Sequence, residues 1–195
     1  MKKEQNKIVI KGLLRFLLAT FFCLVLMIFW VVFHDKSRIS NDLIFGFCFI
    51  LILAMIFGDY GLKVSETMKN QVKFHGADDC KNLGIKIGFV GAIPSYIGVI
   101  ALFLAKIQIV KAPLWLYAMF NVYFYPVFDM FLTKAEYQTI GEHSVLVLSS
   151  IPMYSFIVLV ILPLIMPIAC QIGYSIGYNN IDVKGKLFYK NRKKL

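Results

Sequence analysis

The stretch that decides the fold runs from Ser144 to Ile181, SVLVLSSIPMYSFIVLVILPLIMPIACQIGYSIGYNNI. It contains no Asp, Glu, Lys, Arg or His in 38 residues. As one straight helix it would reach ~57 Å, nearly twice the ~30 Å hydrocarbon core of a bilayer. Only part of the stretch is therefore expected to cross a membrane. We predict the crossing over residues 153–174, followed by a basic cytoplasmic tail over residues 179–195.

The composition extends this prediction to the whole chain. Of 195 residues, 59% are hydrophobic and only 16% are charged, whereas a soluble domain is about half apolar and about a quarter charged. We predict an all-α integral membrane protein that forms a single membrane domain over residues 1–195. Three further apolar runs predict spans at about residues 14–33, 43–62 and 85–107, with a polar cytoplasmic loop over residues 58–86.

The segment over residues 112–131, APLWLYAMFNVYFYPVFDMF, permits two interpretations. It is long enough to cross, yet it is rich in Trp and Tyr, which prefer the headgroup region of a bilayer. We predict an interfacial or re-entrant segment on the outer face. The alternative is a fifth span.

The distribution of positive charge decides between these interpretations. The net charge is +10, and short cytoplasmic loops carry an excess of Lys and Arg. With four spans, the cytoplasmic sections hold 16 basic residues and the outer sections hold five. Five spans would place the six cations of the tail outside. We therefore predict four spans with both termini in the cytoplasm, in the plasma membrane, with anionic lipid headgroups as partners and no nucleic acid.

Small residues mark the expected helix-packing faces. Gly84, Gly88, Ala92 and Ser95 recur at three- or four-residue spacing before and within the third span. Gly173 and Gly177 repeat the same spacing near the end of the last span, where the alternative is that the span ends and the chain turns. Small side chains allow two helix backbones to approach closely in lipid. At the far end of the first span, Trp30 is expected to be an interfacial anchor.

Three residues are candidates for a functional role. Asp129 is an acid in a mainly apolar segment, and such carboxylates often mark ion or proton pathways. The alternative is a carboxylate in contact with water at the outer interface. Pro163 and Pro167 break the hydrogen bonding of the last span, so that freed carbonyl groups could bind a cation or form a hinge. The alternative is a bend that packing accommodates.

The sequence offers little support for catalysis. It has no Walker A loop, no G-x-S-x-G and no HExxH, and its four cysteines lack C-x-x-C spacing. His75, Asp78, Asp79 and Cys80 match no standard metal pattern, and helix capping by the two acids is the simpler interpretation. We predict no metal and no cofactor.

The leading hypothesis is a non-enzymatic membrane protein that acts as a subunit or interaction partner in a membrane complex. A transporter component or an immunity-type protein would fit, with a membrane-protein partner or a second copy of the chain. The alternatives are a small oligomeric carrier or channel, and a lipid-modifying enzyme built on His75, Asp78 and Asp79. Abundant Lys, Ile, Phe and Asn with little Arg favour a bacterial source.

Overall fold

The structure is a computed structural model that describes residues 2–34, 38–75, 81–109, 114–132, 137–140 and 143–179. Its long helices are α1 (Lys2–His34), α2 (Arg38–His75) and α3 (Leu83–Lys106). A fourth rod consists of α6 (Met153–Ile161), the 3-10 turn η3 (Leu162–Leu164) and α7 (Ile165–Tyr178). Among the described residues, four helical segments are long and apolar enough to cross a membrane: Asn6–Val32, Asp42–Asn70, Leu83–Lys106 and Met153–Tyr178. The predicted class is confirmed as far as a mainly helical chain with four helices that could cross a membrane.

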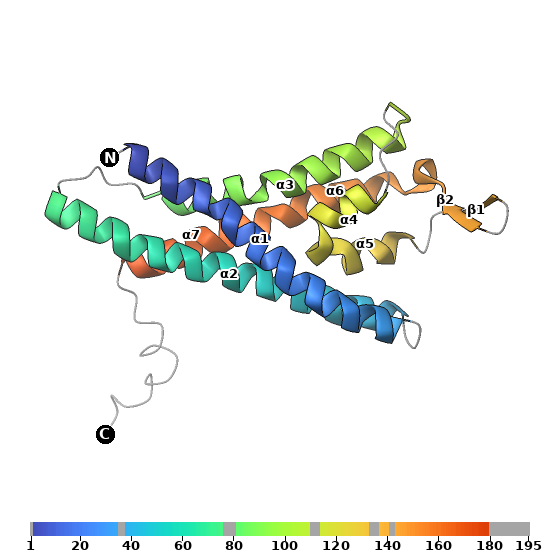
Figure 1. Ribbon diagram of the computed structural model, residues 1–195, viewed down its shortest axis with the longest axis horizontal. Coiled ribbons are helices and arrows are strands. Elements are labelled where there is room, and N and C mark those ends of the chain that lie inside the picture. Colours follow the sequence, from blue (N-terminus) through green and yellow to red (C-terminus); the bar gives the residue numbers. More distant parts are fainter. Residues whose placement is uncertain are drawn as a thin grey trace, which may run out of the picture.

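The four rods form an elongated bundle with two distinct ends (Figure 1). At one end, here called the N end, α1 and α3 begin and α2 and α7 finish. The other end, here called the hairpin end, carries a two-stranded antiparallel sheet of β1 (Tyr137–Ile140) and β2 (His143–Leu146), in which Ile140 pairs with His143. This hairpin was not predicted from the sequence.

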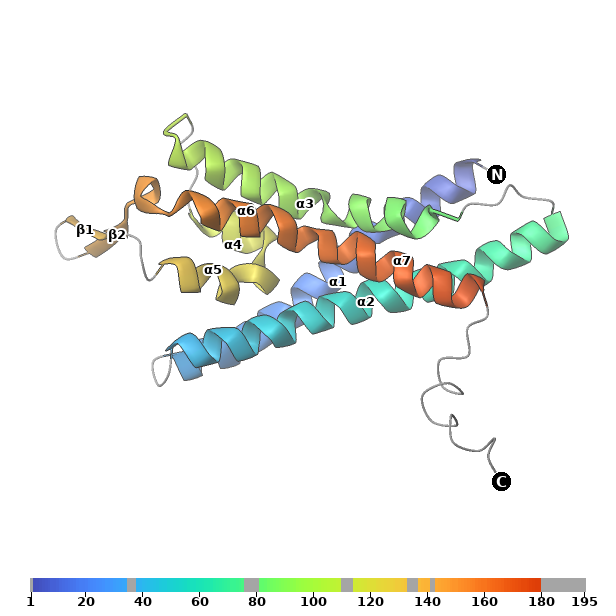
Figure 2. The same cartoon turned by 180° about the vertical axis from the view of Figure 1, so that it is seen from behind.

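The aromatic segment is not a single helix. It consists of α4 (Leu114–Phe120), the 3-10 turn η1 (Val122–Phe124) and α5 (Tyr125–Leu132), here called the insert. Neither helix approaches the ~20 residues that a span needs. In the described part of the chain, α4 packs on α3, η1 on α1 and α2, and α5 on α2. The insert thus occupies the hairpin-end half of the bundle, between α3 and the α1–α2 pair (Figures 1 and 2).

The loop predicted over residues 58–86 is largely helical, so that prediction is wrong. Helix α2 continues to His75, and α3 begins at Leu83. The cause is an apolar face that the net polarity of this segment hides: Tyr60, Val64 and Met68 follow one another at four-residue spacing and are all buried. Tyr60 meets α1, where its hydroxyl donates a hydrogen bond of 2.8 Å to the carbonyl of Ile8, and the neighbouring Gly58 and Gly61 pack against α7.

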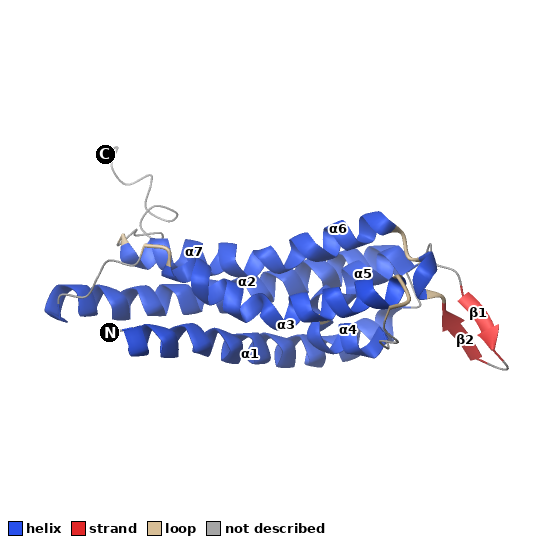
Figure 3. Cartoon of the chain, turned by 90° about the horizontal axis from the view of Figure 1, so that it is seen from above, coloured by secondary structure: helices blue, strands red, loops and turns tan. Residues whose placement is uncertain are grey.

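Two clusters of buried apolar side chains fill the bundle. The larger one extends from the N end to the centre and joins α1, α2, α3, η1 and α7 around residues such as Phe57, Phe124 and Met166. The smaller one lies at the hairpin end and joins α3, α4, α5 and α6 around residues such as Leu102, Phe128 and Leu159. From above, the helices lie nearly parallel along the whole bundle and the hairpin projects from its end (Figure 3).

Candidate functional site

The closest helix contact in the described structure is between α2 and α7, and it is made by glycines. A Cβ atom added at Gly173 would overlap the carbonyl oxygen of Gly58, and one added at Gly61 would overlap the carbonyl oxygen of Cys170. One added at Gly177 would overlap the hydroxyl oxygen of Ser65. The two backbones therefore meet directly, as small residues permit in membrane helices. We call this contact the α7 seam.

The seam continues onto α3. A Cβ added at Gly84 would lie 2.8 Å from the Cα atom of Gln171, and one added at Gly88 would overlap the Cα atom of Pro167. Four of the predicted packing residues, Gly84, Gly88, Gly173 and Gly177, thus lie against a neighbouring backbone or side chain. Ala92 and Ser95 are buried further along the same face of α3.

Both prolines of the last rod are buried. Pro163 lies in η3, where the helix tightens between α6 and α7, and Pro167 packs on the bare backbone of Gly88. A proline ring removes one hydrogen bond and bends a helix, and the missing side chain at position 88 leaves room for the bent backbone. This geometry supports a bend that packing accommodates. The hypothesis that freed carbonyl groups bind a cation remains a prediction.

Gln171 ties the start of α3 to α7, a role that the sequence analysis missed. Its Oε1 accepts a hydrogen bond of 3.1 Å from the backbone N–H of Ile85, and its Nε2 donates one of 3.0 Å to the carbonyl of Lys81. Nε2 also lies 3.2 Å from the hydroxyl of Ser175. The first N–H groups of a helix have no partner within the helix, so Gln171 supplies one from outside. A lone Gln in an apolar run was the available signal.

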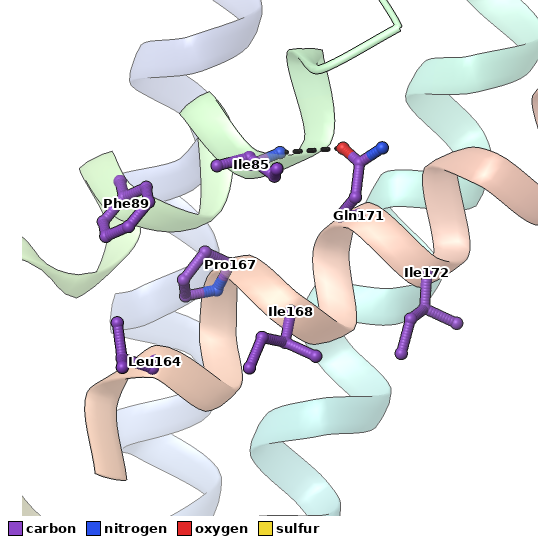
Figure 4. A pocket seen from close by; sticks show the side chains of 7 residues that line it. All are labelled: Ile85, Phe89, Leu164, Pro167, Ile168, Gln171 and Ile172. Atoms are coloured by element: carbon purple, nitrogen blue, oxygen red, sulfur yellow. Dashed lines mark hydrogen bonds between the residues drawn. The ribbon is translucent and has the colours of Figure 1, made fainter. Parts of the chain in front are cut away.

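Beside Gln171, a shallow apolar groove opens on the outer surface of the bundle, with a volume of about 390 Å³. Figure 4 shows its side chains, with those of α3 above and those of η3 and α7 below. They are Ile85, Phe89, Leu164, Pro167, Ile168, Gln171 and Ile172. Gln171 is the one polar residue among them, and both ends of its amide are already hydrogen-bonded within the protein.

A pair of polar side chains holds the insert in place. Ser95 on α3 donates a hydrogen bond to Oδ1 of Asn121, and Nδ2 of Asn121 donates one of 3.2 Å to the carbonyl of Ser95. Both residues are fully buried. Asn121 stands at the break between α4 and η1, and its amide reaches the bare backbone of Gly98. We call this pair the Ser95–Asn121 clasp. It gives Ser95 a polar role beyond its small size.

Asp129 lies on the buried face of α5, together with Pro126, Phe128 and Leu132. Only 6% of it is exposed, so the expectation of a carboxylate in contact with water is wrong. Burial of α5 between α2 and α6 removes that contact. Acids buried inside membrane bundles often mark functional positions, so Asp129 stays a candidate for a functional role.

A second buried acid lies nearby in the bundle. Asp42, near the start of α2, has no exposed surface and accepts a hydrogen bond of 2.9 Å from Nε1 of Trp30. The expectation for Trp30 was an anchor at the membrane interface, but its indole is buried and joins α1 to α2. The ring of Tyr125 also meets it edge-on, with 5.8 Å between the ring centres.

The described residues bring no three His, Cys, Asp or Glu side chains together at metal-binding distance. Asp78, Asp79 and Cys80 lie outside the described residues, as does the basic tail from position 180 onward. Comparisons of the chain with protein-family models, with curated proteins and with solved structures produced no match.

Proposed function

We propose that the chain is a non-enzymatic protein of a bacterial plasma membrane, where it serves as a subunit or interaction partner in a membrane complex. Its four long helices span the bilayer with both termini in the cytoplasm. The insert enters from the outer face and returns to it. The start of α1 and the end of α7 at one end of the bundle, and the insert at the other, support this topology (Figures 1 and 2).

Cysteine accessibility tests the topology. Single cysteines at Thr133 and Lys194, in a background without native cysteines, are labelled in intact cells by a membrane-impermeant maleimide. We expect labelling at position 133 only. Labelling at position 194 would contradict the placement of the tail and would favour five spans.

The proposed role in a complex rests on one observation, the unpartnered apolar face of α1. Only 22% of its membrane-crossing window is buried within the bundle, compared with 44% for α3. Exposed side chains recur along it at alternating spacings of three and four residues, and each is between 51% and 66% exposed: Ile10, Leu14, Leu17, Phe21, Leu24, Ile28 and Val31. This spacing is the one used by pairs of packed helices.

The filled interior favours this role over a pathway through a single copy. Phe57, Tyr123, Phe124 and Phe128 are almost completely buried inside the bundle. At the α7 seam, α7 contacts both α2 and α3 directly, and the insert fills the space between helices in the other half of the bundle. Close-packed interiors of this kind have no room for a hydrated ion.

Site-specific photo-cross-linking tests the proposed role. A photoreactive amino acid replaces Phe21 on the α1 face, and a matched variant carries it at Ile157, which is 62% exposed on α6. We expect a discrete protein adduct from position 21 and lipid adducts alone from position 157. Lipid adducts alone from both positions, with a monomer that purifies free of any partner, would contradict the proposal.

A carrier or channel built from several copies is the second candidate, and the buried carboxylate of Asp129 favours it. In this candidate, flux of an ion through proteoliposomes depends on that carboxylate and on the bend at Pro163. Flux that Asp129→Asn and Pro163→Ala both leave unchanged would eliminate it.

A further inference from the structure

Buried polar side chains are concentrated in the hairpin-end half of the bundle. Six polar or charged residues of the described chain are buried, and five of them lie on the insert or on the helices around it: Asp42, Ser95, Asn121, Asp129 and Ser155. The sixth, Ser65, lies at the α7 seam. A polar group costs free energy when it is removed from water, so the hairpin-end half carries a cost that the seam largely avoids.

Two hydroxyl groups in this half have no hydrogen-bond partner among the described residues. They belong to Tyr117 on α4 and to Ser155 on α6, and both side chains are almost completely buried. Tyr117 packs on Phe128 of α5, with 4.8 Å between the ring centres. Ser155 lies one turn before Leu159 on the buried face of α6, and Leu159 belongs to the same core cluster as Tyr117. Access of water to this cluster would remove the cost of two unpaired hydroxyl groups.

The insert is the element that excludes water from this half. It enters and leaves the bundle at the hairpin end and turns at η1, near the middle of the bundle (Figures 1 and 2). It can therefore withdraw toward the hairpin end without threading the chain between the helices. Its two helices have seven and eight residues, and helices of that length depend on packing for their stability.

Side-chain contacts hold the insert in the bundle. The Ser95–Asn121 clasp joins it to α3. The ring of Tyr125 meets Trp30 of α1 edge-on, and Val127 packs over the bare backbone of Gly46 on α2. Contacts of this kind break and re-form in the loops that open and close over binding sites, whereas the α7 seam is a contact between backbones.

We propose that the insert is a lid over the outer half of the bundle. The lid is closed when the Ser95–Asn121 clasp is formed. When the clasp breaks, the insert withdraws toward the hairpin end and opens a vestibule, which fills with water from the outer face and whose walls include Asp42 and Ser155. The α7 seam stays closed, so the vestibule ends blindly and gives no path through one copy of the chain. The inference rests on the proposed placement of the hairpin end at the outer face, but it does not depend on a partner at α1.

Thiol reactivity in lipid nanodiscs, where both faces of the bilayer meet water, tests the lid. Ser155→Cys is introduced into a chain without native cysteines, and a matched chain keeps Cys170, a fully buried residue of α7, as its only cysteine. Both react with a small, water-soluble methanethiosulfonate, and each rate is expressed relative to the rate in denaturing detergent. We expect position 155 to react at least about ten-fold faster than Cys170, because only position 155 lies in a region that opens locally.

Asn121→Ala separates opening of the lid from general loosening of the bundle. The substitution removes both hydrogen bonds of the clasp, so it should raise the reaction rate at position 155 about ten-fold. The rate at Cys170 should not change in the same background, because the seam stays closed.

A disulfide between α2 and α5 is expected to keep the lid closed. A Cβ atom added at Gly46 would lie 2.8 Å from Cγ2 of Val127, so cysteines at these two positions are close enough to be oxidised to a disulfide. After oxidation, Gly46→Cys with Val127→Cys should reduce the rate at position 155 to that of Cys170, as read by peptide mass spectrometry. Val127→Cys alone, taken through the same oxidation, cannot form this bond and should leave the rate unchanged.

Three results would overturn the inference: equal rates at position 155 and at Cys170 when the clasp is intact, an equal rise at both positions in Asn121→Ala, or a rate at position 155 that the disulfide leaves unchanged. Failure of the proposed function gives a different result, because cross-linking at Phe21 reports on α1 and not on the insert. A chain that reacts at position 155 as expected but gives no protein adduct from position 21 keeps the lid and loses the proposed partner.

Discussion

The two halves of the bundle close the space between helices in opposite ways. Toward the N end, glycines of α2, α3 and α7 have no side chain between the helices, so the helix backbones come into contact. Toward the hairpin end, side chains are added, and the insert fills the gap between α3 and the α1–α2 pair with aromatic rings. The first arrangement leaves no room for a Cβ atom at contact glycines such as Gly61, Gly88 and Gly173, while the second loses stability mainly when atoms are removed. Adding an atom should therefore destabilise the N-end half most, whereas removing atoms should destabilise the hairpin-end half most.

The largest expected effect comes from adding one methyl group at the α7 seam. Gly173→Ala places a Cβ atom on the carbonyl oxygen of Gly58, and the backbones must separate. We expect a loss of about 3 kcal/mol in the free energy of unfolding, measured by denaturant titration in detergent micelles.

The same substitution on the other side of this contact is the control. A Cβ atom at Gly58 would meet the carbonyl oxygen of Ala169 at 3.6 Å, an ordinary contact. Gly58→Ala should therefore be neutral or stabilise the protein by up to about 1 kcal/mol, because alanine favours the helix. Equal destabilisation by the two variants would contradict the seam geometry.

The next effect comes from removing atoms at the hairpin end. Asn121→Ala eliminates both hydrogen bonds of the Ser95–Asn121 clasp and leaves a small cavity at the start of η1. We expect a loss of about 2 kcal/mol, measured by the same titration. Ser95→Ala removes only the hydroxyl bond and should cost about half as much. If Asn121→Ala has the same free energy of unfolding as the parent, the clasp does not hold the insert in place.

A smaller effect is expected at the start of α3, near the N end of the bundle. Gln171→Leu retains the volume of the side chain but loses the hydrogen bonds to Ile85 and Lys81, so the first turn of α3 frays. We expect a loss of about 1 kcal/mol and faster hydrogen exchange at the amide of Ile85, followed by mass spectrometry. Gln171→Glu keeps the acceptor for that amide and should fall between the parent and Gln171→Leu. Unchanged exchange in Gln171→Leu would exclude this role.

The smallest effect is expected on the exposed side of α2. Lys63 and Asp59 form an ion pair of 2.7 Å, but their side chains are 60% and 50% exposed. Asp59→Asn should change the free energy of unfolding by no more than about 0.5 kcal/mol, and added salt should remove the difference. A loss comparable to that of Gly173→Ala would mean that charge, rather than backbone contact, holds this part of α2.

Much of the fold follows from local patterns. Runs of apolar residues indicate all four long helices, and the spacing of Gly84, Gly88, Gly173 and Gly177 indicates faces where backbones approach. The partner of each face depends on the tertiary arrangement, so the pairing of Gly173 with Gly58 was not predictable. Neither was the continuation of α2 to His75, because lysines and acids on its outer side mask the buried positions Tyr60, Val64 and Met68.

The polar contacts were the least predictable part. A single Asn, Gln or Asp in an apolar run signals a buried interaction but not its partner. Asn121 pairs with a serine 26 positions away, and Gln171 reaches a backbone amide 86 positions away. Whether the Asp129 carboxylate is buried or exposed to water likewise depends on how α5 packs, and the charge pattern of the sequence does not encode that packing.

The α7 seam has a consequence for the order in which the protein is made. Gly58 and Gly173 touch, yet 115 residues separate them along the chain. At a synthesis rate of about 5–20 residues per second, the glycines of α2 are made on the order of ten seconds before Gly173 of α7. By the end of that interval α1, α2 and α3 have all been made, and the helix that joins α2 to α3 has not. The final rod is thus the step that completes assembly, and a nascent chain arrested before Gly173 should remain accessible to chaperones and proteases.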